Sequence, residues 1–385
     1  MKQLLLNFFY YNPVGHCVEG LKYAKGLLDT NADLEISIVL NNRTATELAE
    51  ACNFLKAVYK VDEREINMFR DSAACIKRIP LEWDFYIWDN RPQSPSKNEM
   101  EEAFLRFADY CKRKLKVKEG IGTLFPMTLP APMKYTDEAC VDIQLPDHAK
   151  GFANKYQRKG EKFCIMLSGG SVTKRYCPSL KSWIRIINAI NKNHPECTIY
   201  LLGARKSAGN ERSYTAAFSE EEIKSLLSRF DNIIDCYDLG LWNQLAIIKQ
   251  SNIFISPHTG FGMVVLCIGK PWLTLSGGDW PEYFFNKGVP FYSVFPNDKD
   301  YPHAGRTKYS SWQKASSKNW LFSKIERRIN NIYGRLQIPS FREKRVAKKI
   351  PEIINAIRLL LSSDFTYETA FKTHLSNLRS ANIDH

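Results

Sequence analysis

The stretch that decides the fold of this sequence is Cys164-Ile165-Met166-Leu167-Ser168-Gly169-Gly170-Ser171-Val172-Thr173-Lys174-Arg175. Its first residues are apolar, as in a buried strand, and a small glycine-containing loop follows them. Backbone N–H groups exposed in such a loop can bind an anion, and two cations come shortly afterwards. The pattern predicts a diphosphate-binding loop, although Ser-Gly-Gly is also common in ordinary turns. The candidate binding residues are Gly169, Gly170, Ser171, Lys174 and Arg175.

A second loop of this kind lies in Phe254-Ile255-Ser256-Pro257-His258-Thr259-Gly260-Phe261-Gly262-Met263. A strand pattern again ends in a polar, glycine-bearing turn, and an apolar helix is predicted over 263–268. A helix N-terminus directs partial positive charge and N–H groups at bound phosphate. We expect this turn to bind the same diphosphate, with His258 donating a hydrogen bond or else being satisfied by local backbone. The candidates here are His258, Thr259, Gly260, Phe261 and Gly262.

Short apolar runs alternate with helical patterns on both sides of these loops, as in parallel sheets wrapped by helices. Between Gly120 and Gly160 prolines accumulate and the periodicity fades, which is typical of a linker. The predicted fold class is therefore α/β, with two Rossmann-like domains facing each other across a cleft. The expected divisions are 1–150, 151–335 and a set of C-terminal helices over 336–385 that packs back on the first domain.

Individual elements follow from the same patterns. Thr44 and Glu47 have the spacing of a capping box, and Pro351 is expected in the first turn of the last helix. In the first half we expect strands over 4–11, 34–40 and 83–88 and helices over 17–28, 44–54 and 97–116. In the second half we expect strands over 163–167, 198–202, 233–234, 253–256 and 272–275, and helices over 179–191, 219–229, 241–249, 319–333 and 351–361.

Composition is that of a folded, soluble enzyme. Hydrophobic residues make up 44% and charged residues 25% of the 385 residues, which excludes disordered and fibrous classes. Ten cysteines are scattered singly without metal-ligand spacing, so we expect reduced thiols and a cytoplasmic protein. No apolar stretch reaches the roughly 20 residues that a membrane-spanning helix needs.

Positive charge is concentrated near the C-terminus. The segment 301–349 contains thirteen Lys or Arg and two Glu, so it carries +11 of the total net charge of +13. A second basic run lies over 112–118. Such clusters suit anionic lipid head groups, nucleic acid or a phosphorylated acceptor, or they form a solvated face. We expect peripheral contact with the inner membrane face as one outcome.

From about Phe163 to Trp280 the order of features resembles the family 9 glycosyltransferases, the heptosyltransferases of lipopolysaccharide cores. The matching segments are Gly169-Gly170-Ser171, Lys174-Arg175-Tyr176-Cys177-Pro178, Leu201-Leu202-Gly203, 241–249, His258-Thr259-Gly260 and Gly269-Lys270-Pro271. This resemblance implies the GT-B architecture, with an N-terminal acceptor domain and a C-terminal domain for a nucleotide-diphosphate sugar. It also implies inverting transfer without a metal or cofactor.

The resemblance assigns several roles. Lys174 would neutralise the donor diphosphate, the Thr259-Gly260 turn would bind it from the opposite side, and Gly203 and Arg205 would lie near the nucleotide. Two departures concern the donor, since the family's Asp before Thr-Gly is His258 here and a later histidine is replaced by Met263.

The first domain supplies the candidate catalytic residues. The family places Gly-Asp in the loop after the first strand, with the Asp as base, and this chain has Gly15-His16. A histidine suits proton removal from an acceptor hydroxyl because its ordinary pKa lies near neutrality. We predict His16 as base and Asp89 as its acidic partner, with a plain helix-terminus contact as the alternative. The predicted acceptor-binding residues are Asn12, Gly15, Asn90 and Arg91.

Asp279, after the strand at 272–275, either receives sugar hydroxyls of the donor or forms only a turn. The leading hypothesis is transfer of a hexosyl or heptosyl group from a nucleotide sugar to a polar, phosphorylated or lipid-linked acceptor in bacterial glycan or natural-product biosynthesis. A GT-B-like epimerase or phosphorylase is the first rival. The second is a nucleic-acid-binding protein that uses the segment 301–349, a partner we disfavour.

Overall fold

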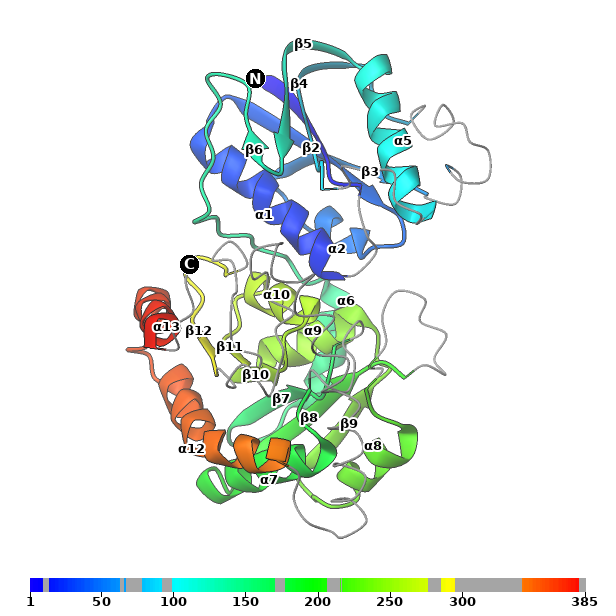
Figure 1. Ribbon diagram of the computed structural model, residues 1–385. Coiled ribbons are helices and arrows are strands. Elements are labelled where there is room, and N and C mark those ends of the chain that lie inside the picture. The colour runs from blue at the N-terminus through cyan, green and yellow to red at the C-terminus, as the bar shows by residue number, and fades with distance from the viewer. Residues whose placement is uncertain are drawn as a thin grey trace. The chain divides into compact units, whose positions relative to one another are not determined.

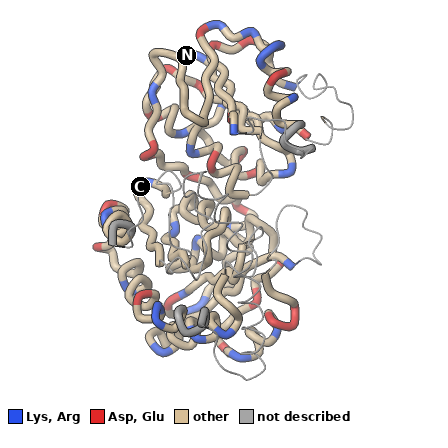
Figure 2. Tube along the Cα trace, viewed as in Figure 1, with Lys and Arg blue, Asp and Glu red and all other residues tan. Residues whose placement is uncertain are grey.

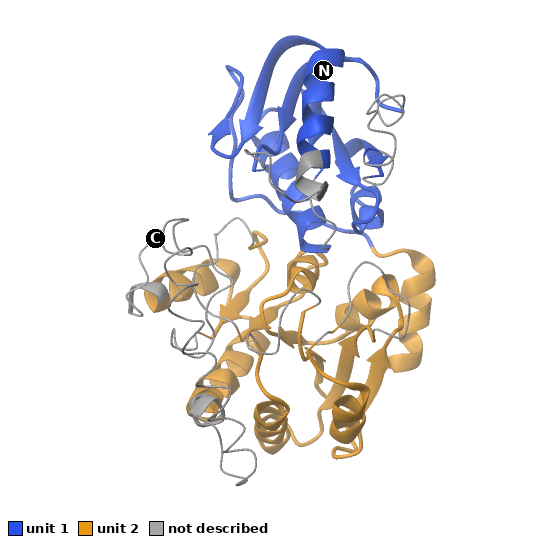
Figure 3. Cartoon of the chain, turned by 45° about the vertical axis from the view of Figure 1, so that its right-hand side comes forward, with its two compact units in different colours: residues 1–144 blue, residues 145–385 orange. Residues whose placement is uncertain are grey.

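The computed structural model describes residues 1–9, 14–62, 66, 78–91, 99–169, 177–205, 215, 217–275, 285–294 and 341–380. The chain divides into two compact units, residues 1–144 and residues 145–385, which are coloured separately in Figure 3. Each unit has one six-stranded sheet with helices against it.

Unit 1 contains a sheet with the strand order β3-β2-β1-β4-β5-β6 (Figure 1). All neighbouring strands are parallel except β5 and β6, which form an antiparallel pair. The elements in chain order are β1 (Lys2–Asn7), α1 (Val14–Thr30), β2 (Leu34–Asn41), α2 (Thr46–Glu50), β3 (Leu55–Val61), β4 (Glu82–Trp88), α5 (Glu99–Lys114), β5 (Lys116–Leu124) and β6 (Met127–Thr128).

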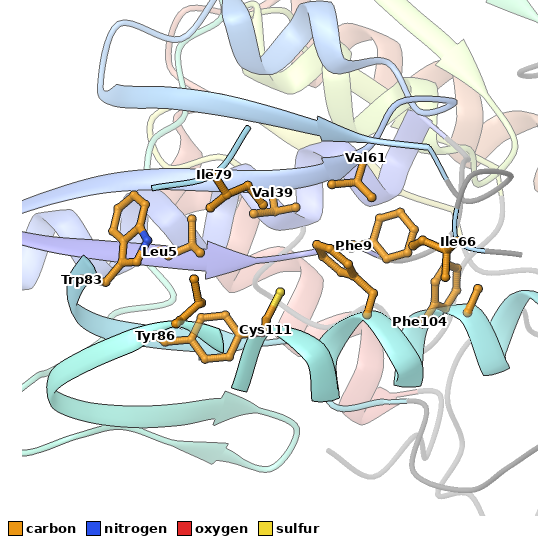
Figure 4. Packing of buried hydrophobic residues seen from close by; sticks show 13 residues of the cluster. Leu5, Phe9, Val39, Val61, Ile66, Ile79, Trp83, Tyr86, Phe104 and Cys111 are labelled. Carbon is orange, nitrogen blue, oxygen red and sulfur yellow. The ribbon is translucent and has the colours of Figure 1, made fainter. Parts of the chain in front are cut away.

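The strands of unit 1 form because both faces of the central sheet are buried. In β1 the apolar run Leu4–Leu6 is fully buried, as expected where helices cover both sides of a parallel sheet. On one face, α5 places Phe104 and Cys111 against Leu5 and Tyr86 of the sheet (Figure 4). Burial of these side chains supplies the main stabilisation of the unit.

Strand β5 corrects the sequence prediction, which ended a helix at residue 116 and began a linker at Gly120. A Cβ on Gly120 would lie 2.7 Å from Pro130, and one on Gly122 would lie 2.5 Å from the carbonyl oxygen of Thr128. The two glycines therefore let the following chain fold closely over the strand. Pairing with β4, rather than intrinsic propensity, makes this charged, glycine-containing segment a strand.

The start of the second predicted helix is also different. Helix α2 covers only Thr46–Glu50, and its N-cap is Ala45, which has no side-chain cap hydrogen bond. Thr44 is buried and its carbonyl accepts from the amide of Thr46. The predicted capping box of Thr44 and Glu47 is therefore wrong, because the chain is still turning out of β2 at Thr44.

Unit 2 repeats the winding with the order β12-β11-β10-β7-β8-β9, in which all neighbouring strands are parallel. Its elements are α6 (Asp147–Ala153), a short 3-10 turn (Asn154–Tyr156), β7 (Lys162–Met166), α7 (Leu180–Asn193), β8 (Thr198–Gly203), α8 (Glu220–Leu227), β9 (Ile233–Tyr237), α9 (Leu241–Gln250), β10 (Ile253–Ser256), α10 (Gly260–Cys267), β11 (Trp272–Thr274), β12 (Phe291–Ser293), α12 (Phe341–Leu361) and α13 (Tyr367–Ser380).

The last two helices belong to unit 2. Helix α12 packs on α7 and on β10 to β12, and α13 packs on β12. The expected packing of these helices on the first domain stays a prediction. Helix α12 begins at Phe341, so Pro351 lies inside it and not in its first turn. The apolar stripe of Ile353, Ile354 and Ile357 is buried. This burial stabilises the helix enough to tolerate the loss of the hydrogen bond that proline cannot donate. The helix expected over 319–333 lies outside the described residues.

Charges of both signs are interspersed along the described parts of both units (Figure 2). Most of the basic segment 301–349 lies outside the described residues. The run at 112–118 spans the last turn of α5 and the start of β5, and Lys112 and Lys116 form ion pairs with Asp109 and Glu82. Within the described helices, none combines the length and apolar character needed to cross a membrane.

Candidate functional site

The two predicted diphosphate loops leave the same edge of the unit 2 sheet. Strands β7 and β10 are direct neighbours and run parallel, with Ile253 beside Phe163 and Ile255 beside Ile165. Their carboxyl ends therefore lie side by side, and the loops that begin at Ser168 and Pro257 start from adjacent positions. The chain winds away from β7 in opposite directions through β8 and β10, which makes this edge the topological switch point where open α/β sheets bind ligands.

Helix α10 begins directly at this edge, and its first residues have packing roles. The N-cap Thr259 accepts a hydrogen bond from the amide of Gly262 through Oγ1, at 3.0 Å. A Cβ on Gly262 would lie 2.1 Å from the indole of Trp272, so only glycine fits there. The ring of Phe261 packs on that of Phe254, with centroids 5.8 Å apart. The first-turn amides of Gly260 and Phe261 are of the kind that a helix leaves for a cap or a ligand.

His258 precedes this N-cap as an uncharged side chain. Dense packing around the imidazole lowers its pKa to about 3, since burial disfavours the charged form. At neutral pH His258 therefore offers one N–H donor and one acceptor. It can bind a hydroxyl or a phosphate oxygen by hydrogen bonding, but it adds no positive charge to the edge.

The predicted nucleotide-side residues Gly203 and Arg205 lie at the end of β8. A Cβ on Gly203 would be 2.4 Å from the ring of Tyr237, so the glycine allows β8 and β9 to pack closely there. Arg205 forms ion pairs of 2.7 Å with both Asp235 and Asp238 and lies over the Tyr237 ring at 4.7 Å. Burial lowers the pKa of Arg205, but the hydrogen bonds that it donates to both carboxylates outweigh this and raise it overall.

Unit 1 has its own switch point, between β1 and β4. These strands are parallel neighbours, and the amide of Asp89 continues the ladder by donating to the carbonyl of Asn7 at 2.9 Å. Asn90 accepts a hydrogen bond of 2.6 Å from the amide of Phe125 and donates back to its carbonyl. Asn90 thus joins the loops after β4 and β5.

His16 lies in the first turn of α1, with Gly15 beside it. Its Nδ1 is 3.1 Å from Oε2 of Glu19, one helical turn later. The imidazole is 28% exposed, whereas the Glu19 side chain is 3% exposed. The carboxylate beside His16 is therefore Glu19 and not Asp89, which corrects the predicted pairing.

Asp89 and Glu19 are joined by Arg91. Its Nη1 donates to both carboxylate oxygens of Glu19 at 2.8 and 3.0 Å, and its Nη2 and Nε donate to Asp89 at 2.6 and 3.0 Å. The guanidinium also lies over the rings of Phe8 and Phe125 at 5.2 and 4.4 Å. Arg91 is thus engaged by protein groups within unit 1.

The pKa shifts in this cluster have clear causes. Burial raises the pKa of Glu19, but the charge of Arg91 and the hydrogen bond to His16 outweigh it, so the pKa of the carboxyl is lowered. Burial likewise lowers the pKa of Arg91, and the charge of Glu19 with the hydrogen bonds to Asp89 raises it overall. Both groups are therefore ionised at neutral pH.

Several predicted residues lie outside the described part of the chain. Gly169 is buried three residues after the end of β7, but the loop residues after it, Asp279 and Asn12 are not described. No cluster of three His, Cys, Asp or Glu suited to a metal occurs among the residues that are described. The sequence also contains Asp298-Lys299-Asp300, an undescribed pair of carboxylates that the sequence reasoning overlooked. The undescribed candidates are Asn12, Gly170, Ser171, Lys174, Arg175 and Asp279.

Sequence reasoning also missed Glu19. An acidic residue within a helix is usually a solvent-facing group, and Glu19 was therefore not chosen as a candidate. Two signals were available. Glu19 stands three residues after His16, which places both on one face of α1, and it lies between the apolar pair Cys17-Val18 and Leu21 in the buried stripe of the helix.

A solved structure shares this architecture, and others are less similar. A glycosyl transferase family 9 structure from Veillonella parvula matches 94% of this chain and 97% of its own length, with a TM-score of 0.60 and 13% identity. An ADP-heptose lps heptosyltransferase II of E. coli matches 76% of this chain and 90% of its own, with a TM-score of 0.46 and 12% identity. A UDP-GlcNAc 2-epimerase of Methanocaldococcus jannaschii matches 78% and 91%, with a TM-score of 0.41 and 11% identity.

No family model matches the sequence, and neither does any curated protein. The likeness is therefore one of structure. The chain has the α/β fold of the family 9 glycosyl transferase from Veillonella parvula, which confirms the predicted GT-B-like class and the resemblance to that family at the level of the fold.

Proposed function

We propose that this protein is an inverting, metal-independent glycosyltransferase that moves a sugar from a nucleotide-diphosphate donor to a hydroxyl group. The acceptor is a glycan, a lipid-linked molecule or a phosphorylated small molecule. The proposal assigns the donor to unit 2 and activation of the acceptor to unit 1. The shared fold with a family 9 glycosyl transferase supports the reaction class.

The observation that carries the proposal is the direct parallel pairing of β7 and β10. It brings the start of the Gly169 loop and the N-terminus of α10 to one edge, so amides from two loops can bind one diphosphate. Lys174 and Arg175 follow the first loop within the sequence and would supply the positive charge that the neutral His258 does not. This arrangement stabilises the leaving diphosphate without a metal.

Acceptor activation falls to His16. Glu19 contacts Nδ1 of His16 and so provides a carboxylate that can orient the imidazole ring. The other ring nitrogen can then act as a general base. In an inverting transfer the acceptor oxygen attacks the anomeric carbon, while the base takes the hydroxyl proton. The bond from that carbon to the diphosphate breaks, and its electron pair leaves with the nucleotide.

Donor binding is tested by thermal unfolding with ADP, GDP, UDP, CDP and dTDP. A ligand that binds only the folded state at about 100 times its Kd adds about 2.7 kcal/mol of stability. We expect one diphosphate to stabilise the wild type and Lys174→Ala to lose the response. Lys192→Ala is the matched control, since this exposed lysine lies in the last turn of α7. Absence of any stabilising diphosphate, or equal loss in both variants, contradicts the donor site.

Turnover then separates transfer from its rivals. The sugar of the stabilising nucleotide is offered with and without acceptor sugars and lipid-linked glycans. Acceptor-dependent release of the nucleoside diphosphate, with an inverted anomer in the product, supports the proposal, and epimer formation without an acceptor supports an epimerase. Activity should persist in EDTA. Loss of activity there would point to the Asp298-Lys299-Asp300 carboxylates as metal ligands.

We further propose a cytoplasmic location with contact at the inner membrane surface through the basic segment 301–349. Its charge of +11 supports this, since each Lys or Arg near an anionic surface contributes about 1 kcal/mol. Sedimentation with vesicles of anionic lipid should show binding that weakens with salt. Equal binding to neutral vesicles argues against an electrostatic contact, and tighter binding to nucleic acid would favour the second rival.

A further inference from the structure

One buried carboxylate separates the candidate base from a fixed cation. Glu19 lies between His16 and Arg91 and is bound by both, through Oε2 to Nδ1 of His16 and through both oxygens to Nη1 of Arg91. The Glu19 side chain is almost fully buried, and the imidazole is the most exposed member of the group. The chain of contacts thus runs from the interior of unit 1 outward to a histidine.

Arg91 fixes the carboxylate in place. Its guanidinium is held on the other side by two hydrogen bonds to Asp89 and is flanked by the rings of Phe8 and Phe125. A planar guanidinium bound in this way cannot turn without breaking several contacts. Glu19 therefore keeps one orientation and remains ionised, since its pKa is lowered by Arg91 once the opposing effect of burial is overcome.

An ionised carboxylate at Nδ1 determines which ring nitrogen of a neutral histidine carries the proton. A carboxylate only accepts hydrogen bonds, so Nδ1 must donate, and the basic lone pair is then on Nε2. An ion-pair link that only holds α1 against β4 would need no more than Arg91 and the two carboxylates. The additional bond to the more exposed His16 is what a positioning role requires.

We propose that Glu19 is the positioning residue of the transfer reaction, holding His16 in the tautomer with hydrogen on Nδ1. This rests on the function proposed above. In that reaction the acceptor hydroxyl gives its proton to Nε2, its oxygen forms the bond to the anomeric carbon, and the nucleoside diphosphate leaves with the electron pair. Glu19 stabilises the imidazolium, which returns its proton to water. Asp89 acts only by holding Arg91.

The tautomer is measured without any substrate, by nitrogen NMR of the imidazoles in the full-length protein, with His16→Gln identifying the His16 signals. Spectra are recorded at rising pH until the imidazole shifts stop changing, so that the tautomer is determined for neutral rings. In the wild type we expect Nδ1 to show a protonated shift and Nε2 an unprotonated one.

Glu19→Gln is the informative variant because it keeps size and shape. Arg91 can only donate, so the carbonyl of the introduced amide faces Arg91 and its N–H faces His16. His16 Nδ1 must then accept, and the proton moves to Nε2, reversing the two shifts. Asp29→Asn, at the exposed end of α1, is the matched control and should change nothing. An Nε2–H tautomer in the wild type, or no reversal in Glu19→Gln, overturns the proposal.

Kinetics test the role once a donor and an acceptor give turnover. The wrong tautomer costs a histidine base about 10⁴-fold in kcat in a serine protease triad. We expect Glu19→Gln to lower kcat about 10²- to 10⁴-fold at an unchanged KM, and Glu19→Asp to restore part of it. A kcat within twofold of wild type refutes positioning even if the tautomer reverses. Failure of the proposed function is a different result, because then no nucleotide sugar is turned over while the NMR outcome stands.

Discussion

Replacing Arg91 with methionine tests the electrostatic centre of unit 1. Methionine keeps the length of the stem between Phe8 and Phe125 but removes the guanidinium that binds Glu19 and Asp89. The two carboxylate side chains are 3% and 1% exposed. The variant must therefore leave two buried charges without their common cation, or protonate them.

The size of the effect follows from that choice. Removing one partner of a buried ion pair costs about 3–5 kcal/mol. Protonation limits this, since neutralising both carboxyls, with ordinary pKa values of about 4.3 and 3.9, costs about 8 kcal/mol at neutral pH but only about 2.5 kcal/mol at about pH 5. We therefore expect Arg91→Met to lose about 3–5 kcal/mol at neutral pH and about 2–3 kcal/mol at about pH 5.

The sign of this pH dependence depends on Glu19. Its pKa is lowered in the folded wild type, so its stabilising contribution is present above the pKa of the unfolded chain and is lost as pH falls through the folded pKa. The wild type thus keeps the contribution at about pH 5, where the carboxyl is still ionised in the folded state. In the variant, burial raises the pKa of this carboxyl and Arg91 no longer opposes it, so the folded state takes up a proton before the unfolded chain does. The destabilisation of the variant therefore becomes smaller as pH falls, and the gap between the two proteins narrows.

Native-state hydrogen exchange with mass spectrometry is the suitable assay, because a chain of two units need not unfold in one step. Peptides from β1 and β4 report unit 1, and peptides from β7 report unit 2 as an internal control. The triple variant Glu19→Gln, Asp89→Asn, Arg91→Met should recover much of the lost stability, with little pH dependence. A loss below about 1 kcal/mol at neutral pH, or the same loss at both pH values, would refute the reasoning.

Three further changes can be measured in the same way. Gly262→Ala places a methyl group 2.1 Å from the fully buried Trp272 ring and should lower the free energy of unfolding by at least about 1–3 kcal/mol. The control Gly151→Ala in α6, with open space around its Cβ, should be neutral or stabilising in urea unfolding. Equal effects of the two variants would contradict the packing argument. Arg205→Met should cost less than about 1 kcal/mol, because its partners Asp235 and Asp238 are 41% and 25% exposed and remain hydrated; a loss as large as that of Arg91→Met in unit 2 peptides would argue against this. His258 has a lowered pKa in the folded state, so the unfolded chain binds the proton first as pH falls below about 6.5. The free energy of unfolding should therefore decrease by about 1–2 kcal/mol by about pH 5. His258→Gln should make stability depend less on pH in this range, and an unchanged dependence would show that other groups cause it.

Periodicity was enough to identify the α/β winding of both units. Buried parallel strands such as β1, β7 and β10 must be continuously apolar, because helices cover both faces of the sheet, and the loops that follow them at Gly169 and Thr259 had distinctive compositions. The edge strand β3 and the strand β5 were missed. Lysines and glycines weaken their local signal, and pairing with β2 and β4 decides their conformation.

The candidate site was predictable only where function depends on position along a strand or helix. His16, Asp89 and Arg91 were proposed because each lies in the segment that follows a strand, and their roles stay predictions. The adjacency of the loops after β7 and β10 was inferred from the winding, and the sheet order confirms that the two strands are neighbours. The contacts among side chains were not predictable. That Glu19 and not Asp89 binds His16, and that Arg91 joins both carboxylates, depends on how α1 is rotated against β4. Distant packing fixes that rotation, and no local pattern of residues specifies it.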